Sequence, residues 1–263
     1  AVDAGLTLVD VDDEATMLAQ IGYEYVKDAL WTVDDAAKRL KQFATQKIKA
    51  YATARDMVAE EGTSQLSPYL RFGLISVREC MREAVAAGGG AGASTWIKEL
   101  IWREFYAMIL YHYPDSVEWE WNEKYRGRLN WSGNKKHFEA WQQGKTGYPI
   151  VDAAMRQLHE TGWMHNRARM IVASFLTKDL HIDWRWGEGH FAQYLMDYEQ
   201  ASNVGGWQWA ASTGTDAQPW FRVFNPTLQG QKFDPKGEYI RRYVPELRGV
   251  KGDDIHEPWK LGM

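Results

Sequence analysis

The chain has 263 residues, of which 45% are hydrophobic and 25% are charged, and its formal net charge is −4 at pH 7. This is the composition of an ordinary soluble globular protein with room for a full core. One cysteine excludes an intramolecular disulfide, and neither a secretory signal nor an apolar run of about 18 residues is present, so we expect a cytoplasmic protein without a membrane span.

Aromatic and charged residues are unevenly distributed. Fourteen Trp and thirteen Tyr are many for this length, and aromatic side chains are favoured where planar ligands or bases stack. Acidic residues crowd the first 35 positions, whereas Lys and Arg occur in pairs further along. The later part can therefore carry a basic groove despite the negative total. Solvated helix faces are the alternative explanation of these pairs.

Helical periodicity dominates from residue 36 onward, and no alternating β-branched run is long enough for a sheet, so we expect an all-α fold. Residues 36–59 carry large apolar side chains at helical steps. Ser67 is the expected N-cap of a helix that begins with proline. Residues 88–93 predict a flexible Gly/Ala connector, followed by a helix over 96–113 that a proline ends.

The later elements are predicted in the same way. Residues 115–147 are typical of short helices and loops. Pro149 opens a further helix that Gly162 ends, and residues 163–180 form another amphipathic helix. From Asn203 onward, Gly, Pro and aromatic residues predict loops.

Residues 205–216 read Gly-Gly-Trp-Gln-Trp-Ala-Ala-Ser-Thr-Gly-Thr-Asp and are interpreted as a Gly-rich loop that holds two indoles. A loop buries a large aromatic side chain less readily than a helix face does, which favours a flat ligand here. In an extended loop, Trp207 and Trp209 point to opposite sides, so one indole can face a cofactor and the other an external ligand. The alternative is that both anchor the loop to the core.

Polar groups also occur where apolar neighbours predict burial. Residues 62–67 place hydroxyls ahead of a helix start, which suits a phosphate, although a simple capping turn has the same pattern. Glu99 and Arg103 share a stripe with Trp96 on a very apolar helix, and Asn166 and Arg169 lie on another. Such groups need partners, which indicates a polar cavity rather than an exposed ion pair.

A third group of polar side chains is expected to end the following helix and to supply acceptors and amide groups for a heterocycle. No histidine spacing suggests a metal site, and we expect no metal. Together the three groups predict an apolar, aromatic-rich pocket for a large cofactor. The residues of the third group are Asp197, Glu199 and Asn203.

Five motifs of the chain resemble, in the same order, those of the photolyase/cryptochrome family, and more narrowly those of class I cyclobutane pyrimidine dimer photolyases. The resemblance runs from about residue 36 to residue 259. The motifs are residues 62–67, 96–106, 145–152, 162–167 and 205–216.

The resemblance implies a two-lobed helical FAD-binding domain over residues 31–263, without the N-terminal α/β antenna domain that family members usually carry. Residues 1–30 lack a core pattern and are interpreted as a tether or linker to a part of the protein outside this chain. We expect a monomer, with no antenna chromophore on this chain.

The resemblance also implies FAD as the cofactor, held between the two lobes. Asn203 is similar to the asparagine that photolyases place beside the reactive flavin nitrogen. Glu199 and Val204 depart from the family pattern, where Asp and a second Asn are usual. The implied FAD-binding residues are Tyr51, Thr63, Ser64, Gln65, Leu66, Ser67, Trp96, Arg103, Asn166, Arg169, Asp197, Tyr198, Glu199 and Asn203.

UV-damaged DNA is the implied substrate, and its damaged site would be extruded from the duplex. Asparagine at position 166, where relatives that repair the (6-4) photoproduct have histidine, favours cyclobutane dimers. The implied lesion-contacting residues are Glu99, Trp102, Asn166, Met170 and Trp209. The implied DNA-binding residues are Arg55, Glu99, Trp102, Asn166, Arg167, Arg222, Gln229 and Lys232.

The implied activity is light-dependent dimer repair, in which the excited reduced flavin gives an electron to the dimer and receives it back. Trp207, Trp184 and Trp131 occupy the positions of the family's electron-transfer chain, from the flavin outward. Two alternatives remain open at this point. One is a cryptochrome-like blue-light photoreceptor, and the other is a flavin- and DNA-binding fragment with weak repair activity.

Overall fold

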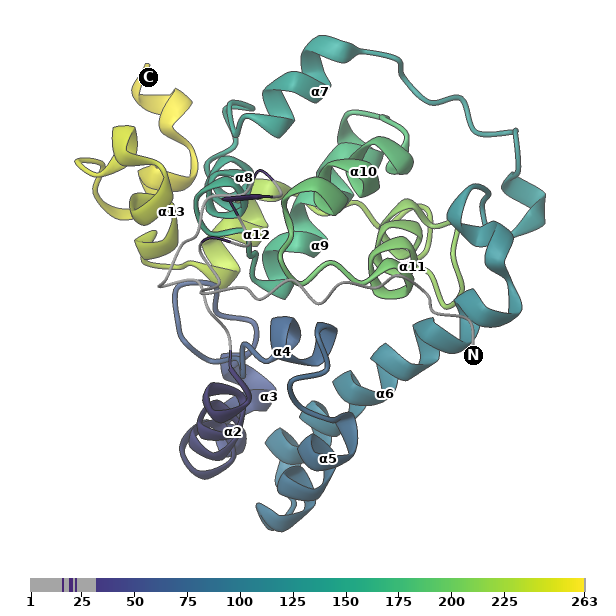
Figure 1. Cartoon of the computed structure of the whole chain (residues 1–263). Coiled ribbons are helices and arrows are strands. Elements are labelled where there is room, and N and C mark those ends of the chain that lie inside the picture. The colour runs from purple at the N-terminus through teal and green to yellow at the C-terminus, as the bar shows by residue number, and fades with distance from the viewer. Residues whose placement is uncertain (1–15, 17–18, 21, 23–31, 263) are drawn as a thin grey trace.

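The computed structural model of the chain describes residues 16, 19–20, 22 and 32–262. The predicted tether over residues 1–30 therefore lies almost wholly outside the described residues. Within the described part, all regular secondary structure is helical and no strand occurs, which confirms the all-α expectation. Figure 1 shows two groups of helices, with the long α6 running from the first group toward the second.

The first group of helices forms an N-terminal lobe around one apolar core. A π-helical turn at Phe43–Lys47 and a 3-10 turn at Ile48–Ala50 connect its first two helices, so the helix expected over 36–59 ends at Ala54. Leu40, Phe43 and Trp96 are buried in this core. The helices are α2 (Val33–Gln42), α3 (Tyr51–Ala54), α4 (Ser67–Arg71), α5 (Val77–Ala86) and α6 (Gly90–His112).

The second group forms a larger C-terminal lobe with its own core. Trp141, Trp184, Trp207 and Tyr239 are fully buried there, so four of the aromatic residues that made the sequence unusual stabilise this lobe. Helix α6 packs against α3 and α5 of the first lobe and against α11 of the second. The helices are α7 (Lys135–Gln142), α8 (Pro149–Thr161), α9 (Asn166–Ser174), α10 (Trp184–Tyr194), α11 (Gln200–Ala211), α12 (Pro226–Phe233) and α13 (Glu238–Tyr243).

Helix α8 begins and ends where the sequence predicts. Pro149 occupies the first turn, and Gly162 adopts the left-handed conformation, at φ 64°, that stops the helix. The buried Asp152 accepts hydrogen bonds from the backbone and hydroxyl of Thr146 and from the backbone of Gly147. These bonds fix the turn that leads into α8.

The expected connector at residues 88–93 was wrong, because α6 already begins at Gly90. The reason is close packing rather than flexibility. Gly92 is buried, and a Cβ at this position would lie 1.9 Å from the carbonyl oxygen of Ile48. Glycine is therefore needed where α6 crosses the 3-10 turn of the first lobe.

The expected loop at residues 205–216 was also wrong, because the first seven of these residues belong to α11. Gly205 lies against the ring of Tyr106, where an added Cβ would come within 2.2 Å of that ring. Glycine here permits two helices to approach, and packing overrides its low helix propensity. Trp207 and Trp209 then project from different faces of one helix.

The segments after α8 differ from expectation in smaller ways. The helix expected over 163–180 begins at Asn166 and continues as a π-helical turn to Asp179. The side chains expected to end the next helix instead follow it: α10 stops at Tyr194, and Glu199 caps α11. The chain after Asn203 is helical in part, since α12 and α13 follow.

Ser67 is likewise the first residue of α4 rather than its N-cap, which is Leu66. Its hydroxyl accepts a hydrogen bond from the indole of Trp163 at 3.3 Å. This bond links the two lobes.

Candidate functional site

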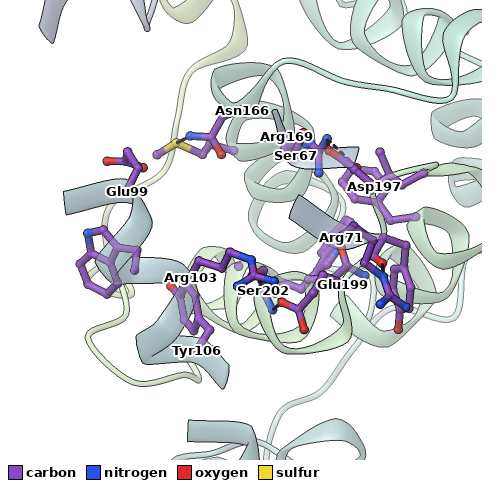
Figure 2. Close-up of a pocket in the computed structure, with 18 of the residues that line it drawn as sticks. Ser67, Arg71, Glu99, Arg103, Tyr106, Asn166, Arg169, Asp197, Glu199 and Ser202 are labelled. Atoms are coloured by element: carbon purple, nitrogen blue, oxygen red, sulfur yellow. Dashed lines mark hydrogen bonds and ion pairs between the residues drawn. The ribbon is translucent and has the colours of Figure 1, made fainter. Parts of the chain in front are cut away.

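A cavity of about 540 Å³ lies between the two lobes. This volume is in the range of about 300–1,000 Å³ that is typical of small-molecule and cofactor sites. Its walls come from α4, α6, α9, α10 and α11 and from the turn before α11. Figure 2 shows Glu99 on one side of the cavity, across from Arg71, Asp197 and Glu199.

The apolar wall of the cavity is built on Trp207. This indole is 1% exposed, and its ring contacts Trp141 at 6.0 Å and Phe191 at 5.1 Å between centroids. Gly187 of α10 lies directly beneath it, because a Cβ there would come within 2.1 Å of the indole. The wall is therefore rigid, as a site that orients a flat ligand requires.

Arg169 and Asp197 form an ion pair on the second wall. The guanidinium donates two hydrogen bonds to the carboxylate, at 2.8 and 3.0 Å, and a third to the carbonyl of Met164. The Asp197 side chain is only 1% exposed. A carboxylate buried this deeply needs its charged partner, so the pair fixes the turn between α10 and α11.

Glu199 caps the N-terminus of α11. Its carboxylate accepts hydrogen bonds from the backbone of Ala201 and from the backbone and hydroxyl of Ser202. Both oxygens are therefore engaged, and the Glu199 side chain, longer than the Asp that the sequence resemblance implies, satisfies free helix amides.

Asn203, one turn into α11, is held from behind by Glu188 of α10. Its amide donates to the Glu188 carboxylate at 3.0 Å and to the Glu188 carbonyl at 3.3 Å. Tyr198 also donates its hydroxyl to Glu188, and burial together with that carboxylate raises the pKa of Tyr198 to about 12. Since its amide hydrogens face Glu188, the side-chain oxygen of Asn203 is not used by these bonds and is available to accept a hydrogen bond.

Arg71 and Arg103 add positive charge on the α4 and α6 sides of the cavity. Arg71 donates to the carbonyl of Tyr198, which connects the N-terminal lobe to the turn before α11. Arg103 pairs with Glu104, whose side chain is mostly exposed. Two arginines that line the same cavity suit an anionic group such as a diphosphate.

The side formed by α6 and α9 has a different character. Trp102 packs its ring against Phe105 and Tyr106, and Asn166 lies beside the sulfur of Met170 at 3.9 Å. Glu99 pairs with Arg55 at 2.5 Å. Broad apolar surfaces with one carboxylate and one amide can bind a planar molecule that has polar edges.

The structure thus gathers most of the predicted site residues around one cavity. Six predicted FAD contacts lie outside its lining. Tyr51, Leu66 and Trp96 are buried in the first core, and Trp96 packs on Phe43 at 4.8 Å. The three others, Thr63, Ser64 and Gln65, precede α4 in the chain. Their contact with a cofactor stays a prediction.

The predicted electron-transfer and DNA-binding residues lie mostly outside the cavity lining. Trp207 lines the cavity, whereas Trp184, which is fully buried, and Trp131, which is half-buried, do not. The indole N–H groups of Trp184 and Trp131 have no hydrogen-bond partner. Of the other DNA-binding candidates, Arg222 and Lys232 are exposed, Arg167 and Gln229 are half-buried, and none lines the cavity.

Sequence reasoning missed several lining residues. Arg71 lies four residues after Ser67 and could have been found from helical spacing. Phe191 near the end of α10 and Leu195 just after it have the same spacing but are indistinguishable from ordinary core residues. Glu188, which holds Asn203 but does not line the cavity, gave no signal, because its role depends on the packing of α10 against α11.

Two features are absent from the part of the chain that the structure describes. Among these residues, no group of three or more His, Cys, Asp or Glu side chains is arranged to hold a metal ion. None of the described helices is long and apolar enough to cross a membrane.

Comparison with known proteins gives consistent results. The family described as FAD binding domain of DNA photolyase matches residues 96–263. The deoxyribodipyrimidine photo-lyase of Vibrio cholerae is 52% identical over 249 residues, covering 90% of this chain and 52% of the relative. That of Escherichia coli is 54% identical over 230 residues, covering 86% and 48%.

Solved structures agree with these relatives. A bacterial class III photolyase from Agrobacterium tumefaciens has a TM-score of 0.83 at 43% identity and is matched over 94% of this chain and 50% of that one. A cryptochrome from Synechocystis has a TM-score of 0.82 at 36% identity, over 88% and 49%. The chain spans about half the length of the relatives it matches.

The fold and the cavity define a two-lobed helical protein with a cofactor-sized site between its lobes. The chain belongs to the DNA photolyase family and carries that family's FAD binding domain.

Proposed function

We propose that the chain, loaded with FAD, repairs cyclobutane pyrimidine dimers in UV-damaged DNA under blue or near-UV light. The observation that carries this proposal is that one cavity combines two kinds of wall. One is charged and suits a cofactor, and the other is aromatic with a single carboxylate and amide. Relatives named deoxyribodipyrimidine photo-lyase, about half identical to the chain, support it.

The cavity fits FAD in size and in chemistry. Arg71, Arg103 and Ser67 would hold the diphosphate, because guanidinium and hydroxyl groups donate to phosphate oxygens. Trp207 and Phe191 would bound the flavin ring with apolar surface. Asn203, fixed by Glu188, would offer an acceptor oxygen to a ring N–H.

The lesion would occupy the side of the cavity formed by α6, α9 and Trp209. Trp102 and Trp209 would form apolar walls for the two pyrimidines. Glu99 would accept from a pyrimidine N–H, and Asn166 would bond a carbonyl edge. These contacts replace the stacking that the damaged bases lose when they leave the duplex.

When bound, reduced FAD supplies the light absorption and the electron that opens the cyclobutane ring. The protein's residues would hold the two reactants in one cavity and orient them. Trp207 would shield the flavin side from water, and Met170, whose sulfur lies beside Asn166, would add apolar surface on the lesion side. Proximity and exclusion of solvent are what the chain contributes.

Two further sets of residues belong to this proposal. Trp207, Trp184 and Trp131 would carry electrons from the surface to an oxidised cofactor; this assignment rests on their motif positions and on the decreasing burial from Trp207 and Trp184 to Trp131. Arg167, Arg222, Gln229 and Lys232, together with Arg55, would contact the DNA backbone near the lesion. A monomer acting in the cytoplasm, without an antenna pigment on this chain, stays our prediction.

The test is light-dependent repair by the purified, FAD-loaded and reduced chain. Irradiation with a dimer-containing oligonucleotide should restore unmodified thymine, whereas a dark control should not. Glu99→Ala should impair repair more than FAD binding, because it removes a lesion contact. FAD binding without repair would contradict the proposal and favour a photoreceptor of the cryptochrome type, such as the Synechocystis structure.

A further inference from the structure

Glu99 is already engaged in the protein without DNA. Its carboxylate, on α6, lies 2.5 Å from the guanidinium of Arg55, which directly follows α3. The two side chains are 32% and 19% exposed, so the pair is partly shielded from water. Arg55 also stacks on the buried ring of Tyr51, 5.4 Å from its centroid, which fixes the arginine in place.

A second ion pair of matching geometry lies close by in the chain. Arg167 of α9 pairs with Asp56 at 2.7 Å, and these side chains are 17% and 34% exposed. Arg167 also stacks on an aromatic ring, that of Phe233 at 4.3 Å. The two pairs differ in one respect: Glu99 and Arg55 line the cavity, whereas Asp56 and Arg167 do not.

We propose that the Arg55–Glu99 ion pair makes the protein selective for damaged DNA. A backbone phosphate of any bound DNA replaces Glu99 as the partner of Arg55, but only a lesion in the cavity then forms a hydrogen bond with Glu99. This inference rests on the proposed function. It concerns an exchange of partners between a carboxylate, a guanidinium, a backbone phosphate and a pyrimidine N–H, and no bond other than hydrogen bonds forms or breaks.

Desolvation of the Glu99 carboxylate is the physical basis of this selectivity. A phosphate competes with Glu99 for Arg55, since both are anions that bind a guanidinium. If the phosphate takes Arg55, the carboxylate stays in a partly dry cavity beside Trp102 without a cation, which is unfavourable. Undamaged DNA provides no new partner for the Glu99 carboxylate, so this penalty remains. An extruded dimer donates an N–H to the same carboxylate and removes the penalty.

The Asp56–Arg167 pair provides the control. Removing Arg167 from Asp56 also leaves a carboxylate alone, but Asp56 lies outside the cavity, so a lesion bound in the cavity would not become its new partner. This pair therefore weakens binding of damaged and undamaged DNA alike. The first pair discriminates and the second does not.

The experiment measures dark binding of two short duplexes, identical except for one thymine dimer, to the FAD-loaded protein. Glu99→Gln removes the charge that competes for Arg55. We expect undamaged DNA to bind more tightly by roughly three- to tenfold, and the preference for the dimer to fall. Asp56→Asn should tighten binding of both duplexes by similar factors and leave the preference unchanged. Bound FAD and unfolding midpoints establish that each variant is folded.

A double-mutant cycle separates this mechanism from a general change of charge. In Arg55→Gln, the further change Glu99→Gln should no longer tighten binding to undamaged DNA, because its effect passes through Arg55. An equal gain in both backgrounds would overturn the inference. So would an unchanged preference for the dimer in Glu99→Gln. If the unaltered chain binds DNA without any preference for the dimer, the proposed function itself fails.

Discussion

Arg169 and Arg156 show how burial decides the contribution of one residue. Each arginine pairs with a carboxylate and also donates to a backbone carbonyl, with closest contacts of 2.8 Å to Asp197 and 2.7 Å to Glu246. The Asp197 side chain is 1% exposed, whereas that of Glu246 is 60% exposed. The two ion pairs have similar contact distances, but their difference in burial predicts different contributions to the free energy of unfolding.

Arg169→Gln should lower the free energy of unfolding by about 2–3 kcal/mol, because it leaves a buried carboxylate without its cation. Arg156→Gln should lower it by less than about 1 kcal/mol, since water can solvate Glu246. Urea denaturation of both variants measures the difference. Equal losses would mean that Asp197 is solvated in the folded protein.

Trp131 provides a second prediction at this scale. Trp131→Phe should fold and bind FAD, because a half-buried indole contributes less to the core than Trp207 does. Photoreduction of the oxidised protein by an external thiol should become much slower, while chemically reduced protein should still repair dimers. Unchanged photoreduction would show that electrons take another route, and loss of repair would show that Trp131 is structural.

Helices α6 and α11 show why element boundaries were harder to predict than the fold class. Periodicity and proline placed α8 correctly, because those signals act within the helix itself. The glycines of α6 and α11 indicated loops, yet Gly92 and Gly205 are there for close contact with other segments. A single sequence shows the glycine but not the neighbour that requires it.

The same reasoning predicts a contrast within α10. In Gly187→Ala, the new methyl group would meet the buried indole of Trp207, so we expect a destabilisation of about 1–3 kcal/mol and weaker FAD binding. In Gly189→Ala, nothing lies within 4 Å, and the higher helix propensity should stabilise by about 0.5–1 kcal/mol. Thermal unfolding with and without FAD measures both. A neutral Gly187→Ala would show that Trp207 moves freely.

Two cores and one cavity between them describe the molecule as a whole. The sequence motifs predicted the cavity's composition, including Glu99, Asn166 and Asn203, because those residues carry their chemistry in their identity. The motifs did not predict which other residues form hydrogen bonds and ion pairs with these side chains. The ion pairs of Arg55 and Arg169 join residues 44 and 28 positions apart, and such contacts exist only in the folded chain.

Buried histidines make stability depend on pH at this scale. Burial lowers the pKa of His165 and of His190 to about 4, with nearby arginines and His159 adding to the respective shifts. The unfolded chain binds these protons near pH 6.5, before the folded protein does. Their contribution to stability is therefore present above pH 6.5 and is lost as the pH falls toward 4.

Burial raises the pKa of Asp179 to about 6, which acts in the opposite direction, so the test compares two proteins. His165→Asn keeps an acceptor at the N-cap of α9 and removes one titrating group. Between pH 6.5 and 4, the stability of the unaltered chain should fall more steeply, by up to about 1.4 kcal/mol per pH unit. Parallel curves from urea denaturation would show that His165 is protonated in the folded state.

We propose that FAD and the lesion share one cavity, within reach of direct electron transfer. The fluorescence lifetime of the bound reduced flavin tests this claim directly, because electron transfer to a neighbouring dimer competes with emission. We expect a dimer-containing oligonucleotide to shorten the lifetime and the matched undamaged oligonucleotide to leave it unchanged. An unchanged lifetime with the dimer bound would show that the two molecules occupy separate sites and would contradict the account.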